Sequence, residues 1–288
     1  MKKLLISILK AFLYTGVFLG IQIAVTLILS LFFLLLGEIM VYSMGIPDAD
    51  TVLNANLLPA VTFLSAWLTL LFFWMFFAVR GKRFSHEVRL YKMAAPASAV
   101  LGPLECGFGL SLLASIALAM IPFPEAWYET YDESMELLLS GNPWFLAAAT
   151  VLAAPLVEEV VFRGLIYTRL CRGMYRPFAA LISAVIFGLV HGTLLHLFYT
   201  IPMGLLLCLF YEKYRSLWAP ILLHMSFNLA GSVLEYYSWA PTGVMIALLV
   251  IGLYLTVLGL LSMRWYRRKT GLYVKPVKTA EPTPELLP

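Results

Sequence analysis

Long apolar stretches separated by short charged segments form the main pattern along this chain. Several of these stretches exceed the roughly 18 uncharged residues that a bilayer-spanning helix needs. The pattern therefore predicts an all-α, polytopic membrane helix bundle. Its transmembrane helices, about eight, are expected near 12–36, 56–79, 95–121, 144–168, 177–193, 195–211, 217–235 and 242–263.

The composition agrees with a membrane protein and excludes an ordinary soluble domain. Of the 288 residues, 61% are hydrophobic and 12% are charged, whereas soluble domains are roughly half apolar and a quarter charged. So much apolar surface cannot be buried in one aqueous core. We expect the lipid bilayer as the surrounding partner, and no nucleic acid.

The charges also predict how the chain is oriented. With the N-terminus in the cytoplasm, every Lys and Arg except Arg163 falls in a cytoplasmic segment, and the charged residues of the outer loops are all acidic. This partition follows the positive-inside rule, so both termini are predicted to be cytoplasmic. A short basic start and a compact bundle suit a prokaryotic plasma membrane.

The chain is predicted to form a single transmembrane domain over residues 1–270. Residues 125–139 mix acidic with large apolar side chains, a pattern typical of an amphipathic helix on the outer membrane surface. The tail, 271–288, contains prolines and few large apolar residues, and we expect it to be disordered.

A few ionisable residues lie away from the predicted span ends. Each such side chain costs at least about 2.5 kcal/mol in the hydrocarbon, so its presence requires a reason. These ionisable residues are Glu105, Glu158, Glu159, Arg163, His191 and His224, and Asn228 is a polar neighbour. Glu105 stands apart from the rest in the sequence, and its role stays open between a buried hydrogen bond and a cavity wall. His196 is interpreted as a residue at a span boundary.

Two adjacent carboxylates occupy the fourth span. Glu159 and Arg163 are four residues apart on a helix, so they can form an ion pair that offsets their burial. Glu158 points about 100° away from Glu159 and has no partner on its own helix. It therefore needs a partner from another span.

The partners of Glu158 are expected from the fifth and seventh spans. His224 and Asn228 share one helix face by their spacing, and His191 ends the fifth span. At about 1.5 Å per residue, these groups reach similar depths. We predict one shared cavity near the midplane, leaning toward the cytoplasmic side.

Such a cavity has the groups for hydrolysis without a covalent nucleophile. A carboxylate next to an imidazole can deprotonate water, and a second imidazole with a carboxamide can stabilise an oxyanion. The same residues also suit zinc, with Glu158, His191 and His224 as ligands and Glu159 acting on the bound water.

Other intramembrane proteases are excluded by missing residues. All aspartates (Asp48, Asp50 and Asp132) fall in predicted outer loops, so no aspartyl pair can form in the membrane. Neither a Gly-x-Ser-Gly nor an HExxH motif occurs.

Three motifs in order resemble those of one family. Glu-Glu-x-x-x-Arg at 158–163, Phe-x-x-x-His at 187–191 and His-x-x-x-Asn at 224–228 are similar to the motifs of the CPBP family. This family comprises the CAAX-processing type II endopeptidases and the bacteriocin-processing or immunity (Abi) proteins. The resemblance covers about 143–235, which we take as the catalytic core.

The resemblance implies an intramembrane endopeptidase that cleaves a membrane-associated or prenylated-type peptide. It assigns water activation to Glu158 with His191, and the oxyanion site to His224 with Asn228. Glu159 and Arg163 would then support the pocket or hold the substrate. We expect a glutamate mechanism without a cofactor, and keep a zinc-dependent metalloprotease as the alternative.

Two other hypotheses stay open at this point. A transporter also places Glu and His at the midplane, but it predicts internal repeats or broken helices, and no repeat is visible. A catalytically silent member could confer immunity or act as a scaffold with the same residues intact. The sequence does not identify the substrate or the oligomeric state.

Overall fold

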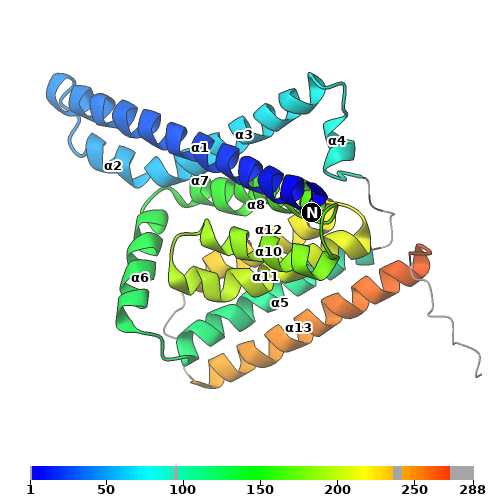
Figure 1. Ribbon diagram of the computed structural model, residues 1–288. Helices are drawn as coiled ribbons and strands as arrows, with labels where there is room; N and C mark the ends of the chain where they lie inside the picture. The colour runs from blue at the N-terminus through cyan, green and yellow to red at the C-terminus, as the bar shows by residue number, and fades with distance from the viewer. Residues whose placement is uncertain (1, 92, 94–96, 236–241, 273–288) are drawn as a thin grey trace, which may run out of the picture.

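The described part of the protein is helical, as predicted. The computed structural model describes residues 2–91, 93, 97–235 and 242–272, and within these it contains no strand. Of the predicted tail 271–288, everything after residue 272 lies outside the described residues. Figure 1 shows the α-helices; π-helical segments are labelled η here. The elements in order are α1 (Lys2–Glu38), η1 (Ile39–Ser43), α2 (Ala49–Ala55), α3 (Leu57–Ala78), α4 (Phe84–Glu87), α5 (Ser98–Met120), α6 (Glu125–Leu139), α7 (Pro143–Ala147), η2 (Ala148–Ala153), α8 (Ala154–Glu158), η3 (Glu159–Tyr167), α9 (Thr168–Leu170), α10 (Arg176–Leu189), α11 (Leu194–Tyr214), α12 (Trp218–Glu235) and α13 (Thr242–Lys269).

Each predicted span corresponds to a helix or a run of helices. Two of these, Arg176–Leu189 and Trp218–Leu234, are apolar but short. α10 has 14 residues, so it is about 21 Å long against a hydrocarbon core of about 30 Å. In the described residues, six other helices are long and apolar enough to cross a membrane: Lys2–Ser43, Leu57–Ala78, Ser98–Met120, Pro143–Leu170, Leu194–Tyr214 and Gly243–Lys269. The chain is therefore an integral, multi-pass membrane protein, and its orientation in the membrane stays a prediction.

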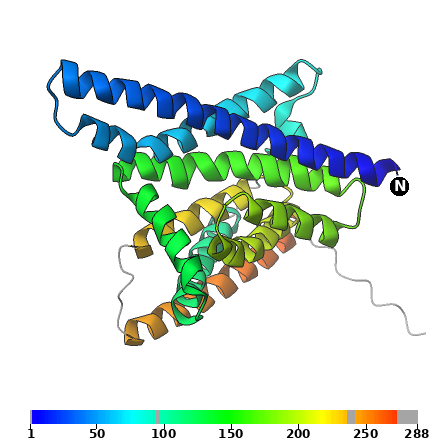
Figure 2. The same cartoon turned by 60° about the vertical axis from the view of Figure 1, so that its left-hand side comes forward.

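The span Pro143–Leu170, here called the central span, lies between two groups of helices. In Figure 2 it runs below α1 and α3 and above α10, α11, α12 and α13. It contacts α1 and α3 on one side, and α10, α11 and α12 on the other. The second half of the span is therefore surrounded mostly by protein, whereas Trp144 and Leu152 in its first half are exposed.

Proline and π-helical segments shape the central span. Pro155 has no N–H to donate to a carbonyl one turn earlier, and the segment before it, η2, is π-helical. The following segment, η3, is π-helical from Glu159 to Tyr167. We predicted a regular α-helix here, and the π-helical segments depart from it. Such turns are common at functional sites and change the direction in which successive side chains point.

Glycines bring α5 and α13 into close contact. A Cβ atom added at Gly109 would lie 2.6 Å from the backbone nitrogen of Thr256, and one at Gly259 would lie 2.6 Å from that of Cys106. Small residues of this kind let membrane helices approach closely and pack by dispersion. α5 thereby forms a fixed wall next to α12 and α13.

The predicted amphipathic helix is present with the predicted bounds, as α6. It stands at one end of the bundle, where it links α5 to the central span (Figure 1). Tyr128 donates hydrogen bonds to the carbonyls of Leu118 and Ile121, at 3.0 and 2.7 Å. The ring of Phe123 lies 4.9 Å from that of Phe198 on α11. These contacts attach α6 to the helices on which the candidate site is built.

Candidate active site

A cavity of about 370 Å³ lies among the helices, and the four predicted catalytic side chains all line it. Glu158 comes from the central span, His191 follows α10, and His224 and Asn228 come from α12. The fold thus brings three separate motifs to one cavity. Apolar side chains provide much of the remaining wall, among them Leu58, Leu118, Leu138, Leu139, Leu146, Met203 and Phe227.

A fully buried ion pair lies behind the cavity. Arg163 Nη1 and Glu159 Oε1 are 2.7 Å apart, and neither side chain is exposed. This pair was predicted from the spacing of the two residues. The second Arg163 nitrogen donates to the carbonyl of Gly204 at 3.3 Å, and the guanidinium lies 4.3 Å from the ring centre of Phe187. Arg163 is thereby held by groups from the central span, α10 and α11.

Glu159 also fixes the orientation of His224. The same Oε1 atom lies 2.9 Å from His224 Nδ1. An ionised carboxylate only accepts hydrogen bonds, so Nδ1 carries the proton and donates it. His224 Nε2 is left to face Glu158, at 3.7 Å from its Oε2 atom. Neither Glu159 nor Arg163 lines the cavity; Glu159 is connected to it by its hydrogen bond to His224, and Arg163 by its ion pair with Glu159.

Glu158 meets residues from the fifth and seventh predicted spans, as expected. Across the described ranges no direct hydrogen bond or ion pair joins Glu158 to His191, so their pairing through an activated water molecule stays a prediction. The imidazole within ion-pair distance of Glu158 belongs to His224. Glu158 and His191 face the same cavity instead. A sequence gives the depth of a residue on its helix, whereas these contacts depend on how each helix is rotated.

His191 is held by its own helix. Its Nδ1 atom lies 2.7 Å from the carbonyl oxygen of Phe187 and donates to it. Its Nε2 atom therefore carries no proton in the neutral ring and can accept a hydrogen bond from within the cavity. Phe187 is fully buried and contacts both imidazoles, with ring centres 4.7 Å from His191 and 5.7 Å from His224. Gly192, at φ 84°, supplies the turn that follows.

Asn228 has one amide hydrogen already engaged. Its Nδ2 atom donates to the carbonyl of Thr150 in η2 at 2.8 Å. The second hydrogen on Nδ2 has no such bond, and Asn228 lines the cavity one helical turn from His224. The predicted pairing of these two side chains on one face of α12 agrees with this placement.

The cavity extends toward α6. Its wall includes the second half of α5, the first half of α11 and the second half of α12, together with α6 residues Tyr131 and Met135. In the predicted orientation, these halves lie away from the cytoplasm. We expected the cavity to lean toward the cytoplasmic side. That expectation came from the depths of the catalytic residues alone, without the position of α6 at the end of the bundle.

His196 belongs to the cavity wall, which the sequence analysis missed. Its Nδ1 lies 2.6 Å from the hydroxyl of Thr193, the residue that caps α11. Its ring is 4.9 Å from that of Tyr131 on α6 and 6.0 Å from that of His191. The sequence contained a signal for this position. Thr193 is a good N-cap residue, and a helix that starts there has His196 in its first turn, close to His191.

Glu105 is not part of the cavity. Its Oε2 atom accepts a hydrogen bond from the Ser262 hydroxyl at 3.1 Å, which joins α5 to α13. Of the two roles left open, a structural hydrogen bond fits this position.

The zinc alternative requires Glu158, His191 and His224 to act as ligands of one metal ion. Glu158, His191 and His224 are ligand types that zinc accepts, and each imidazole has its second nitrogen hydrogen-bonded, as in zinc sites. However, within the residues that the structure describes, no group of three or more His, Cys, Asp or Glu side chains is arranged to hold a metal ion. The donors fit zinc in kind but not in their present arrangement.

Residues 140–230 match the family model described as Type II CAAX prenyl endopeptidase Rce1-like. Over 91 residues the chain is 38% identical to a Bacillus subtilis (strain 168) protein named "Putative membrane peptidase YdiL", a stretch that is 32% of this chain and 37% of that relative. No solved structure matches the chain significantly. The matched segment contains all three motifs, so the resemblance to the CPBP family is confirmed over this segment. The bacterial relative also agrees with the expected prokaryotic origin.

Proposed function

We propose that this chain, whose residues 140–230 carry the core of the CPBP family, is an intramembrane endopeptidase. The observation that carries the proposal is the meeting of Glu158, His191, His224 and Asn228 at one largely apolar cavity. Four polar groups converging from three parts of the helix bundle are expensive to bury, and such convergence is typical of a functional site.

Water activation is the role proposed for Glu158 with His191. The side chain of Glu158 is 16% exposed and lines the cavity, so a water molecule there can reach its carboxylate. His191 Nε2 is an acceptor because Nδ1 donates to Phe187. A water molecule between them would donate one hydrogen to each group. Glu158 then removes a proton as the water oxygen attacks the peptide carbonyl carbon.

Oxyanion stabilisation is the role proposed for His224 with Asn228. His224 donates to Glu159 from Nδ1, so it can donate to an oxyanion from Nε2 only as an imidazolium. Two carboxylates flank this ring: Glu159 accepts from Nδ1, and Glu158 lies 3.7 Å from Nε2. Asn228 contributes its second amide hydrogen. Glu158 returns the proton to the leaving nitrogen, which yields a new amine and a new carboxylate.

The substrate class follows from the wall of the cavity. Leucine, methionine and phenylalanine side chains line it, so an apolar segment next to the cleaved bond is favoured. We propose a membrane-associated or prenylated-type peptide as the substrate. The roles of Glu159 and Arg163 are to position His224 rather than to hold the substrate.

The experiment is cleavage of a lipid-tethered reporter peptide by the purified full-length protein in bilayer nanodiscs. We expect a single cut mapped by mass spectrometry, and a loss of kcat of about a thousandfold or more in Glu158→Gln. Equal turnover by wild type and Glu158→Gln would refute the protease assignment. No cleavage of any tethered peptide, with the variant and wild type equally folded, would favour the silent immunity or scaffold alternative.

Metal dependence is tested on the same reaction. We propose that no cofactor is needed, so exhaustive chelation should leave kcat unchanged. Loss of activity on chelation, with recovery on adding back one zinc ion per protein, would reverse this choice. His191, His224 and Glu158 would then be the ligands.

A further inference from the structure

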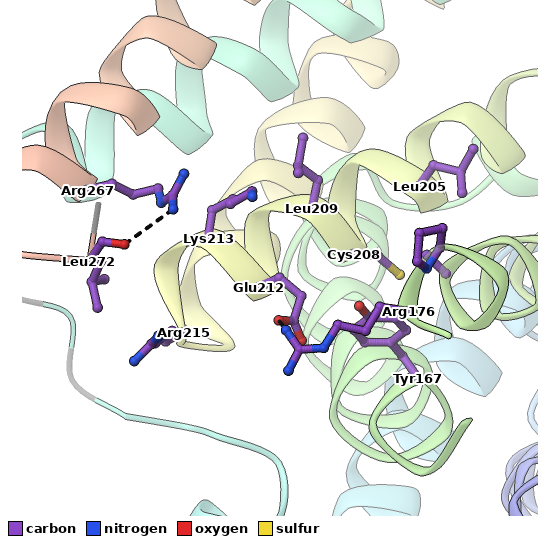
Figure 3. A pocket seen from close by; sticks show the side chains of 12 residues that line it. Tyr167, Arg176, Leu205, Cys208, Leu209, Glu212, Lys213, Arg215, Arg267 and Leu272 are labelled. Atoms are coloured by element: carbon purple, nitrogen blue, oxygen red, sulfur yellow. Dashed lines mark hydrogen bonds and ion pairs between the residues drawn. The ribbon is translucent and has the colours of Figure 1, made fainter. Parts of the chain in front are cut away.

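A second cavity of about 440 Å³ lies at the end of the bundle away from α6. It is bounded by the first turn of α10, the last turns of α11 and the end of α13 (Figure 3). These are ends of membrane helices, so the cavity lies at the level where the bilayer meets water. None of its lining residues belongs to the proposed catalytic set.

Positive charge gathers at this second cavity. Among the described residues that line it, Arg176, Lys213, Arg215 and Arg267 are accompanied by one carboxylate, Glu212. In Figure 3, Lys213 and Arg267 lie on one side of the opening and Arg176 lies beside Glu212 on the other. The cavity therefore carries an excess of positive charge and is suited to an anion.

The single carboxylate is already occupied by arginines. Glu212 Oε2 lies 2.7 Å from Arg176 Nη1, and its Oε1 lies 3.4 Å from Arg89 Nη1. Glu212 thus has little capacity to neutralise Lys213 or Arg215. Arg267 donates to the carbonyl of Leu272 at 3.2 Å.

An apolar strip leads away from these charges. Leu205, Leu209 and Lys213 are spaced four residues apart, so they follow one face of α11 from the bilayer interior to its surface. Leu205 and Leu209 are each 37% exposed, on a helix that spans the membrane. Pro177 and Ala180 of α10 form the opposite wall.

We propose that this cavity binds an anionic phospholipid, with its phosphate at Lys213 and Arg215 and an acyl chain along Leu205 and Leu209. Basic pockets between membrane helices at the bilayer surface are known to attract anionic headgroups. Inorganic phosphate shares the charge but cannot use the apolar strip. The proposal concerns a binding site and does not depend on the protease assignment.

The test is lipid binding to the purified full-length protein in a neutral detergent, measured by native mass spectrometry and by the shift in Tm. The ligands are phosphatidylglycerol, phosphatidylcholine with the same acyl chains, and inorganic phosphate. We expect phosphatidylglycerol to bind more tightly than the other two. The variant Lys213→Gln/Arg215→Gln should bind it about tenfold or more weakly, because each interfacial cation contributes roughly 1 kcal/mol.

A matched control removes the same charge from the same end of the bundle. Arg172→Gln/Arg264→Gln changes two cations outside the cavity, and we expect it to bind phosphatidylglycerol like wild type. Equal weakening in the two double variants would overturn the proposal, since it would indicate a diffuse basic surface. Equal binding of inorganic phosphate, or of phosphatidylcholine, would overturn it as well.

A charge-preserving variant excludes a folding artefact. Lys213→Arg/Arg215→Lys should keep phosphatidylglycerol binding within about twofold of wild type. If it loses binding as fully as the glutamine variant while Tm without lipid is unchanged, headgroup charge is not what the cavity recognises and the proposal fails.

Discussion

The central span and the first helix differ most clearly in how they use the membrane. In the most apolar window of the central span 56% of the residues are buried, against 6% for Lys2–Ser43. The central span carries Glu158, Glu159 and Arg163, while the bilayer interior of the first helix contains no charged residue. Lipid accepts apolar side chains at almost no cost, but ionisable groups are tolerated only where other helices provide partners. Burial by protein and chemical capacity therefore coincide in one part of the chain.

The largest effect on stability is expected from breaking the buried ion pair. Arg163→Leu would leave the Glu159 carboxylate without its counter-charge, a loss of about 3–5 kcal/mol. Thermal unfolding in detergent measures this, and activity should fall with it because His224 loses its orientation. Lys10→Leu on the first helix is the control, with no more than about 0.5 kcal/mol expected. Similar destabilisation by both variants would contradict the contrast between the two helices.

A second, smaller effect is expected from Phe187. This ring is fully buried and contacts both imidazoles, so Phe187→Ala should destabilise by about 3 kcal/mol through the cavity it leaves. Phe12 on the first helix is 65% exposed, and Phe12→Ala should change the unfolding free energy by less than about 0.5 kcal/mol. If the two losses were alike, burial by protein would not be what distinguishes the spans.

His196 offers an effect on activity with little effect on stability. Its ring joins Tyr131 of α6 to the cavity beside His191, so we expect His196→Ala to lower kcat/KM about tenfold by loosening α6 over the substrate. Tm should change little. An unchanged kcat/KM in this variant would mean that α6 does not help to form the working cavity.

The smallest effect concerns pH at the ion pair between the partly buried Glu87 and the buried Arg169. Burial by itself raises the pKa of this carboxyl, but the hydrogen bonds and charges of Arg169 and Lys82 outweigh it and hold the pKa below 4.5. Ionised Glu87 therefore stabilises the protein above pH 4.5, and this contribution is lost as the pH falls through the lowered pKa. Unfolding of wild type and Glu87→Gln should differ by about 1 kcal/mol at neutral pH, the net worth of one typical hydrogen bond, because the glutamine can still accept from Arg169. The difference should vanish in acid; one that grows on acidification would contradict the sign.

The sequence predicted the features that depend on spacing along one helix. Glu159 and Arg163 pair as their four-residue separation indicates, and the acidic and apolar pattern of 125–139 gave the bounds of α6. Contacts between helices were less accessible. The direct contact of Glu158 with His224 depends on helix rotation and on the π-helical turns of the central span, and neither leaves a mark in hydrophobic periodicity.

The position of the cavity was likewise predictable only in part, as far as it depends on single helices. Depth along each helix could be estimated from the rise per residue, which brought the four predicted residues to one level. The extension of the cavity toward α6, and the place of His196 in its wall, required knowing which helix covers the bundle. A polar residue near a span end has no distinctive pattern unless its neighbours in space are known.

The most direct measurement compares two buried glutamates in one assay. Glu158 and Glu105 both lie within membrane helices, but Glu158 lines the cavity and Glu105 binds Ser262 on α13. We expect Glu158→Gln to abolish cleavage of the tethered peptide, with kcat lower by about a thousandfold, and Glu105→Gln to retain it within about threefold. Equal activity in the two variants, whether both retained or both lost with the fold intact, would contradict a catalytic role specific to the carboxylate at Glu158.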